Sequence, residues 1–122
     1  MIADVSDLAL FSVPINEVTN QLINQYWPGP VSIIIGGQAF RLPADEKLRD
    51  LLRQTGPLVA PSANPEGLPP ATTIEEAKKY FSAEGGSASG GGVDWYEDGG
   101  TIVGKPSKLI EIKDGTVRVL RP

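Results

Sequence analysis

Helical and strand patterns alternate along this chain of 122 residues, and together they predict an α/β fold. Asn16 to Tyr26 and Ala44 to Thr55 place apolar side chains at helical spacing, and Gly56 ends the second pattern. Val31 to Ile35 is a β-branched run, typical of a strand covered on both faces. Asp114-Gly115 separates two alternating segments, which indicates a β-hairpin. The chain therefore contains both element types in a single short sequence.

Length and composition bound the class of protein. The chain is long enough for one domain with a core, and 14 Gly and 11 Pro indicate short elements joined by many turns. Eleven basic and fifteen acidic side chains give a net charge of −4, so binding nucleic acid would need a locally basic face. The absence of Cys and His excludes disulfides, thiolate catalysis and a histidine base. Any chemistry must therefore depend on positioning and electrostatics.

No stretch of the sequence has the length and apolar character of a membrane span, and none resembles a secretory signal. We therefore expect no membrane partner and a cytoplasmic location.

The first half of the chain supplies the clearest elements. Asp4 is expected to cap a short helical turn, and the Asn16 to Tyr26 helix is expected to expose Thr19 opposite its apolar face. Trp27 is interpreted as a packing residue at the end of this helix. After Val31 to Ile35, two glycines turn the chain into a second strand over 39–42. The next helix should bury three leucines, Leu48, Leu51 and Leu52.

The second half is expected to hold one helix and several strands. Thr72 or Thr73 can cap a helix that runs to about Phe81, with an acidic side chain three residues on as in a capping box. Residues 82–92, SAEGGSASGGG, have the composition of a flexible insert and lack the context of a phosphate-binding loop. Strands are expected over 93–96, 108–112 and 116–120.

The stretch from Gly56 to Thr73, GPLVAPSANPEGLPPATT, combines many conformational restraints with a few short polar side chains. Leu58-Val59-Ala60 has the length of a buried strand end, and the prolines that follow forbid a regular ladder. Ser62, Asn64 and Thr72 could bind a ligand or could simply cap turns of a stiff loop. The local pattern alone favours the second interpretation.

Motifs along nearly the whole chain resemble the YrdC/Sua5 family of threonylcarbamoyl-AMP synthases. They are Trp27-Pro28-Gly29-Pro30-Val31-Ser32, Phe40-Arg41-Leu42-Pro43, Ser62-Ala63-Asn64, Asp98-Gly99-Gly100, Pro106-Ser107 and Leu120-Arg121-Pro122. The resemblance implies a mixed, twisted sheet with flanking helices, and residues 1–122 as a partial domain of this type. It also implies a nucleotidyltransferase that converts L-threonine, bicarbonate and ATP, with Mg²⁺, to threonylcarbamoyl-adenylate for the t6A37 modification of tRNA.

The resemblance also assigns candidate site residues. L-threonine would contact Arg41, Ser62 and Ser107, while ATP would contact Gly37, Asn64, Thr72 and Arg121. No side chain is assigned as a catalytic nucleophile, and no protein-bound metal is expected. Phosphoryl transfer of this kind depends on positioning and charge compensation, so the lack of Cys and His is no obstacle.

Three departures from the family pattern are Lys108 after Ser107, the absence of a glycine after the terminal Arg-Pro, and the Gly/Ser insert. The family's amino-terminal segment, with its lysine and arginine for the triphosphate, also has no counterpart. We therefore expect that the chain carries half a site and is inactive alone. It would need an amino-terminal complement or self-association, and tRNA would be involved only indirectly. One alternative is a non-catalytic regulatory or RNA-binding module, since the resemblance also implies double-stranded RNA binding. The other alternative is a split or decayed remnant that needs a partner chain.

Overall fold

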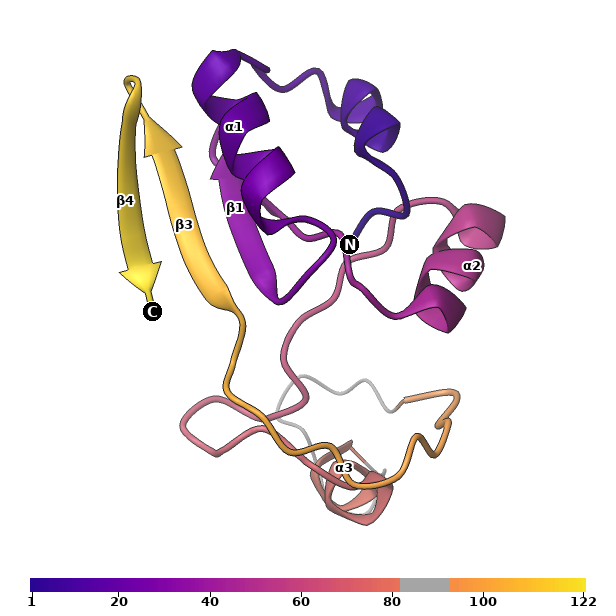
Figure 1. Ribbon diagram of the computed structural model, residues 1–122. Coiled ribbons are helices and arrows are strands. Elements are labelled where there is room, and N and C mark those ends of the chain that lie inside the picture. The colour runs from indigo at the N-terminus through magenta and orange to yellow at the C-terminus, as the bar shows by residue number, and fades with distance from the viewer. Residues whose placement is uncertain (82–92) are drawn as a thin grey trace. The chain divides into compact units, whose positions relative to one another are not determined.

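A computed structural model describes residues 1–81 and 93–122 of the chain (Figure 1). These residues form two units, which are described separately. Unit 1 comprises Met1–Ala60 and Pro106–Pro122, and unit 2 comprises Pro61–Lys105. The expectation of a flexible insert at 82–92 falls outside the described residues.

Unit 1 is built around a four-stranded mixed sheet. Its strands are β1 (Val31–Ile35), β2 (Gln38–Phe40), β3 (Lys108–Lys113) and β4 (Thr116–Arg121), in the order β2-β1-β3-β4. β1 and β3 are parallel, with Ile33 opposite Ile110, while β2 and β4 are antiparallel to their neighbours. The α/β fold and the mixed sheet with flanking helices are therefore confirmed.

Three helical segments complete unit 1: η1 (Val5–Phe11), α1 (Glu17–Tyr26) and α2 (Glu46–Thr55). Asn16 and Asp45 cap α1 and α2, because each side-chain oxygen accepts from the backbone N–H three residues later, at 2.9 Å in both cases. Asp4 precedes η1, but Asp7 provides the capping bonds by accepting from the backbone N–H groups of Ala3 and Asp4. The Asp4 carboxylate instead pairs with arginines of α2.

The core of unit 1 lies between α1, η1 and one face of the sheet. Trp27 is 8% exposed, and its indole N–H donates to the Val31 carbonyl oxygen at 2.7 Å, so its packing role is confirmed. The other buried members of the cluster are apolar side chains of the sheet, of α1 and of the amino-terminal segments: Ile2, Leu8, Leu22, Ile23, Val31, Ile33, Ile35, Phe40, Leu42 and Ile110.

Unit 2 contains α3 (Ile74–Phe81) among turns and irregular segments. The Thr73 hydroxyl accepts from the Glu76 backbone N–H at 3.2 Å, and the Glu76 carboxylate accepts from the Thr72 backbone N–H at 2.7 Å. The predicted cap of this helix is therefore confirmed. No helix within the described parts of the chain has the length and apolar character to cross a membrane.

Four local predictions were wrong. Residues 58–60 form no strand and Val59 is 95% exposed, while 93–96 are irregular. Neither segment has a partner strand among the described residues, and strand propensity alone does not supply one. Thr19 is buried, because its hydroxyl donates to Asn16 Oδ1 at 3.0 Å and so loses no hydrogen bond. Leu51 is 46% exposed, since α2 buries only the stripe that contains Leu52.

Candidate functional site

The seven predicted site residues are divided between the two units. Gly37, Arg41, Ser107 and Arg121 belong to unit 1. Ser62, Asn64 and Thr72 belong to unit 2. The geometry of each group is therefore described within its own unit.

Ser107 holds two arginines in unit 1. Arg41 Nη1 donates to Ser107 Oγ at 2.6 Å, across 66 positions of sequence. Arg121 Nε donates to the carbonyl oxygen of the same serine at 2.7 Å. Both contacts are short for N–H···O hydrogen bonds, as expected when the donor is charged. The structure thus brings together Arg41 and Ser107, both assigned to threonine, and adds Arg121, which was assigned to ATP.

The backbone around Arg41 is fixed on both sides. Arg41 follows β2, and its carbonyl oxygen accepts from the Ile2 N–H at 3.0 Å. The carbonyl oxygen of the next residue, Leu42, accepts from the Gly29 N–H at 2.9 Å. Phe40 and Leu42 are both buried, so the half-buried Arg41 lies between two core residues. Its guanidinium therefore projects from a well-anchored segment.

Positive charge dominates around Arg41. Neither Arg41 nor Arg121 has a carboxylate within ion-pair distance among residues 1–81 and 93–122, whereas Arg49 and Arg53 both do. Arg41 Nε is buried and has no hydrogen-bond partner in the described parts of the chain. Burial and then repulsion from Arg41 lower the pKa of the Met1 ammonium. Two uncompensated guanidinium groups beside a hydroxyl make an arrangement suited to an anion such as a carboxylate.

Gly37 lies at the other end of β2 from Arg41. It is the second glycine of the turn between β1 and β2, and its φ of +83° is one that glycine adopts readily. A Cβ at this position would meet nothing within 4 Å, so the conformation rather than space requires glycine here. Within unit 1, no described contact joins Gly37 to Arg121.

In unit 2, Asn64 tightens the Pro-rich loop with its amide group. Both N–H bonds of Nδ2 are used, because Nδ2 donates to the Pro65 carbonyl oxygen at 3.1 Å and to that of Leu68 at 2.9 Å. Since both partners are carbonyl oxygens, the amide cannot be flipped. Asn64 Oδ1 is left buried without a partner. Ser62 is exposed, and its carbonyl oxygen accepts from the Asn64 N–H at 3.0 Å.

The donors of Thr72 are also occupied. Its backbone N–H and its hydroxyl donate to Glu76 Oε2, at 2.7 and 3.1 Å. These two bonds, with the backbone bond first, lower the pKa of Glu76. In this arrangement both Thr72 donors are bound to Glu76 in the first turn of α3, so donating to a nucleotide would require Glu76 to release them.

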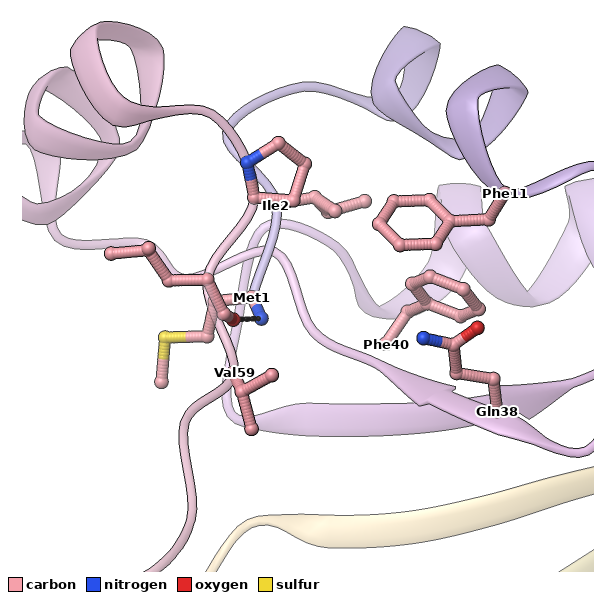
Figure 2. A pocket seen from close by; sticks show the side chains of 8 residues that line it. Met1, Ile2, Phe11, Gln38, Phe40 and Val59 are labelled. Atoms are coloured by element: carbon pink, nitrogen blue, oxygen red, sulfur yellow. Dashed lines mark hydrogen bonds between the residues drawn. The ribbon is translucent and has the colours of Figure 1, made fainter.

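A small pocket of about 100 Å³ lies elsewhere in unit 1 (Figure 2). Met1, Phe11, Gln38, Phe40 and Val59 are among its lining residues, and none of the seven predicted site residues lines it. Figure 2 shows the Phe11 and Phe40 rings close together, and they meet edge to face at 5.0 Å between centroids. Sequence reasoning missed this pocket, because its walls come from separate apolar segments that carry no common motif.

Comparisons with known proteins show a family match over the whole chain. A family model described as "Telomere recombination" and named for Sua5, YciO and YrdC matches residues 1–122. A Mycobacterium tuberculosis relative is 29% identical over 93% of this chain, which covers 54% of that relative. The threonylcarbamoyl-AMP synthase of Pyrococcus abyssi is 30% identical over 99% of this chain, which covers 38% of the relative.

Solved structures show the same relationship. The structure of P. abyssi Sua5 complexed with L-threonine matches with a TM-score of 0.80 and 27% identity, over 99% of this chain and 38% of that one. A second P. abyssi Sua5 structure matches with a TM-score of 0.78. The chain thus spans about half the length, or less, of these relatives. Because the family model covers every residue and the fold agrees, this chain belongs to the Sua5/YrdC family.

Proposed function

We propose that this chain contributes to the synthesis of threonylcarbamoyl-AMP from L-threonine, bicarbonate and ATP, for the t6A37 modification of tRNA. The observation that carries the proposal is the Arg41–Ser107 pair. The Arg41 guanidinium has no carboxylate partner among the described residues, and it donates to the Ser107 hydroxyl at 2.6 Å. The chain that carries this pair is a member of the Sua5/YrdC family. In the proposal, these two side chains of unit 1 bind the threonine carboxylate, and Ser62 of unit 2 is a separate candidate for contact with the same amino acid.

The chemistry requires orientation rather than a nucleophilic side chain. The threonine amine attacks bicarbonate, water leaves, and a carbamate forms. A carbamate oxygen then attacks the α-phosphorus of ATP, the bond to the β-phosphate oxygen breaks, and pyrophosphate leaves. Arg41 and Ser107 would hold the amino acid by its carboxylate, which leaves the amine free to react. A chain without Cys or His can perform this role, because no covalent intermediate is needed.

The candidate nucleotide contacts are Arg121 and the backbone at Gly37 in unit 1 and, separately, Asn64 and Thr72 in unit 2. The nucleotide would arrive as its Mg²⁺ complex. Within the described residues no three Asp, Glu, His or Cys side chains gather as a metal site, so the ion's ligands would come mainly from phosphate and water. Arg41 and Arg121 carry too little charge to balance a triphosphate. We therefore propose that cations outside these 122 residues, from an amino-terminal complement or a second copy, complete the site.

The test is a titration of L-threonine together with an assay of pyrophosphate release. Both are made with the chain alone and with an added amino-terminal family segment. We expect weak binding and negligible turnover alone, and turnover with the complement. Arg41→Ala and Ser107→Ala should each raise the KM for threonine about 10- to 100-fold, because each removes a charge-assisted hydrogen bond worth about 1.5–3 kcal/mol. The KM for ATP should change far less.

Arg118→Ala is the matched control, since Arg118 is an exposed arginine of the same sheet with no ion pair among the described residues. It should leave both KM values unchanged. Unchanged threonine affinity in Arg41→Ala, or no turnover from the complemented chain with Arg41 and Ser107 intact, would refute the assignment.

A further inference from the structure

The two hydrogen bonds at Ser107 join residues that the family resemblance assigns to different substrates. Arg41 binds the hydroxyl at 2.6 Å, and Arg121 binds the carbonyl oxygen at 2.7 Å. The Ser107 hydroxyl accepts from Arg41, so its own hydrogen remains available to a ligand. Ser107 is thus a direct structural link between Arg41 and Arg121.

A register irregularity in β4 brings Arg121 to this position. Ile110 pairs with Val119, but the next pair is Leu109 with Arg121, so Leu120 is an extra residue in β4. Such a bulge changes where the following side chain points, and bulges are frequent beside functional sites. Without the extra residue, Leu109 would lie opposite Leu120. The contact between Arg121 and Ser107 therefore depends on a specific feature of the strand.

The geometry of guanidinium allows Arg121 to keep this contact while binding a ligand. Nε is used by Ser107, and the Nη groups of Arg121 have no hydrogen-bond or ion-pair partner among the described residues. Because a guanidinium has five donors in a rigid plane, an anion bound at the Nη groups would hold Nε in place against the Ser107 carbonyl. A lysine offers three donors from a single nitrogen, and it lacks the rigid plane that separates Nε from the Nη groups.

We infer that Arg121 is a positioning residue of the threonine pocket. By holding the Ser107 backbone, Arg121 keeps the Ser107 hydroxyl in place for its hydrogen bond with Arg41, and it thereby couples nucleotide binding to threonine binding. The inference rests on the proposed function for the identity of the ligands. It differs from an assignment of Arg121 to ATP alone, because it requires Arg121 to affect threonine binding when no nucleotide is present. Coupling of this kind is reciprocal, so threonine should raise nucleotide affinity by the same factor.

The first measurement uses the ligand-free chain, with Arg121→Lys and Arg121→Ala as variants and Arg118→Lys and Arg118→Ala as controls. The Nε–H resonance of Arg41 is recorded by ¹H–¹⁵N NMR. Both Arg121 variants should shift and broaden this signal, and the Arg118 variants should leave it unchanged. An unchanged Arg41 signal in Arg121→Ala would overturn the inference, whether or not the chain binds threonine.

The second measurement is a titration of L-threonine without nucleotide. Both Arg121 variants should bind threonine about five- to tenfold more weakly than the wild type, as expected for the loss of one hydrogen bond, and lysine should not rescue binding. Equal threonine affinity of wild type and Arg121→Ala would overturn the inference. A wild-type chain that binds no threonine, even with the complement, would refute the proposed function instead, and the NMR result would still decide the role of Arg121.

Discussion

Replacing Asn64 by alanine should distinguish a ligand-binding residue from one that only stabilises a turn. The substitution removes two hydrogen bonds, from Nδ2 to the carbonyl oxygens of Pro65 and Leu68, each worth about 0.5–1.5 kcal/mol. It also removes a buried Oδ1 that has no partner, which relieves about 1–3 kcal/mol. The two effects nearly cancel, so the free energy of unfolding should change by no more than about 1 kcal/mol.

Nucleotide binding should respond more strongly than stability. Because both Nδ2 hydrogens are occupied, the free capacity of Asn64 is the acceptor Oδ1, and an amino or hydroxyl group of a nucleoside that reached this buried atom would supply its missing donor. With the complemented chain, Asn64→Ala should raise the KM for ATP and leave that for threonine nearly unchanged. Asn64→Asp should be worse for stability, since it turns a carboxylate towards two carbonyl oxygens.

The assay is urea unfolding followed by circular dichroism, with Asn24→Ala on the exposed face of α1 as the control. A loss of more than about 3 kcal/mol in Asn64→Ala, with unchanged KM for ATP, would refute the reasoning. Asn64 would then be a structural residue of the loop.

Two further predictions concern stability and association. Hydrogen bonding to Arg53, with smaller contributions from Arg49, holds the pKa of Asp4 below its ordinary value of 3.8. The Asp4 carboxylate therefore stabilises the fold at pH values above 3.8, and this contribution is lost as the pH falls through the lowered pKa. In unfolding curves recorded at pH 2.5–7, the free energy of unfolding of Asp4→Asn should therefore fall less steeply below about pH 4 than that of the wild type. An equally steep fall in both proteins would contradict this role. β4 is an edge strand among the described strands and its six residues are all exposed, so we expect concentration-dependent self-association in analytical ultracentrifugation. Val119→Lys should weaken this association and Val103→Lys in unit 2 should not, while a wild-type chain that is monomeric at all concentrations would refute it.

Elements with local chemical signals could be predicted from the sequence. The helices α1 and α2 form where the helical spacing of apolar residues predicted them, and Asp114 and Gly115 both adopt positive φ, 50° and 72°, as the hairpin turn requires. The failures were residues whose state depends on a partner that the hydrophobic pattern does not reveal. Val59 is apolar enough for a strand but has no strand beside it within residues 1–81 and 93–122, and Thr19 is polar but is buried because Asn16 satisfies its hydroxyl.

The candidate site could be predicted only in part, for the same reason. The Arg41–Ser107 pair spans 66 positions, and family resemblance rather than any local pattern placed these residues together. The contact between Arg121 and Ser107 depends on the extra residue in β4, which alternation of apolar and polar residues does not reveal. Likewise, the occupied donors of Asn64 and Thr72 become visible only when their partners are known.

Strand direction explains why Arg41 and Arg121 meet at one end of the sheet. Parallel pairing places the starts of β1 and β3 together, and the Lys108 N–H donates to the Pro30 carbonyl oxygen at 3.0 Å. β4 runs antiparallel to β3 (Figure 1), and β2 runs antiparallel to β1, so both end where β1 and β3 begin. This brings Arg41 and Arg121 to Ser107. Gly37, in the turn between β1 and β2, must then lie at the opposite end. The sheet topology thus gathers two cations around one serine, although Arg41 and Ser107 themselves lie just outside the strands, one after the end of β2 and one before the start of β3.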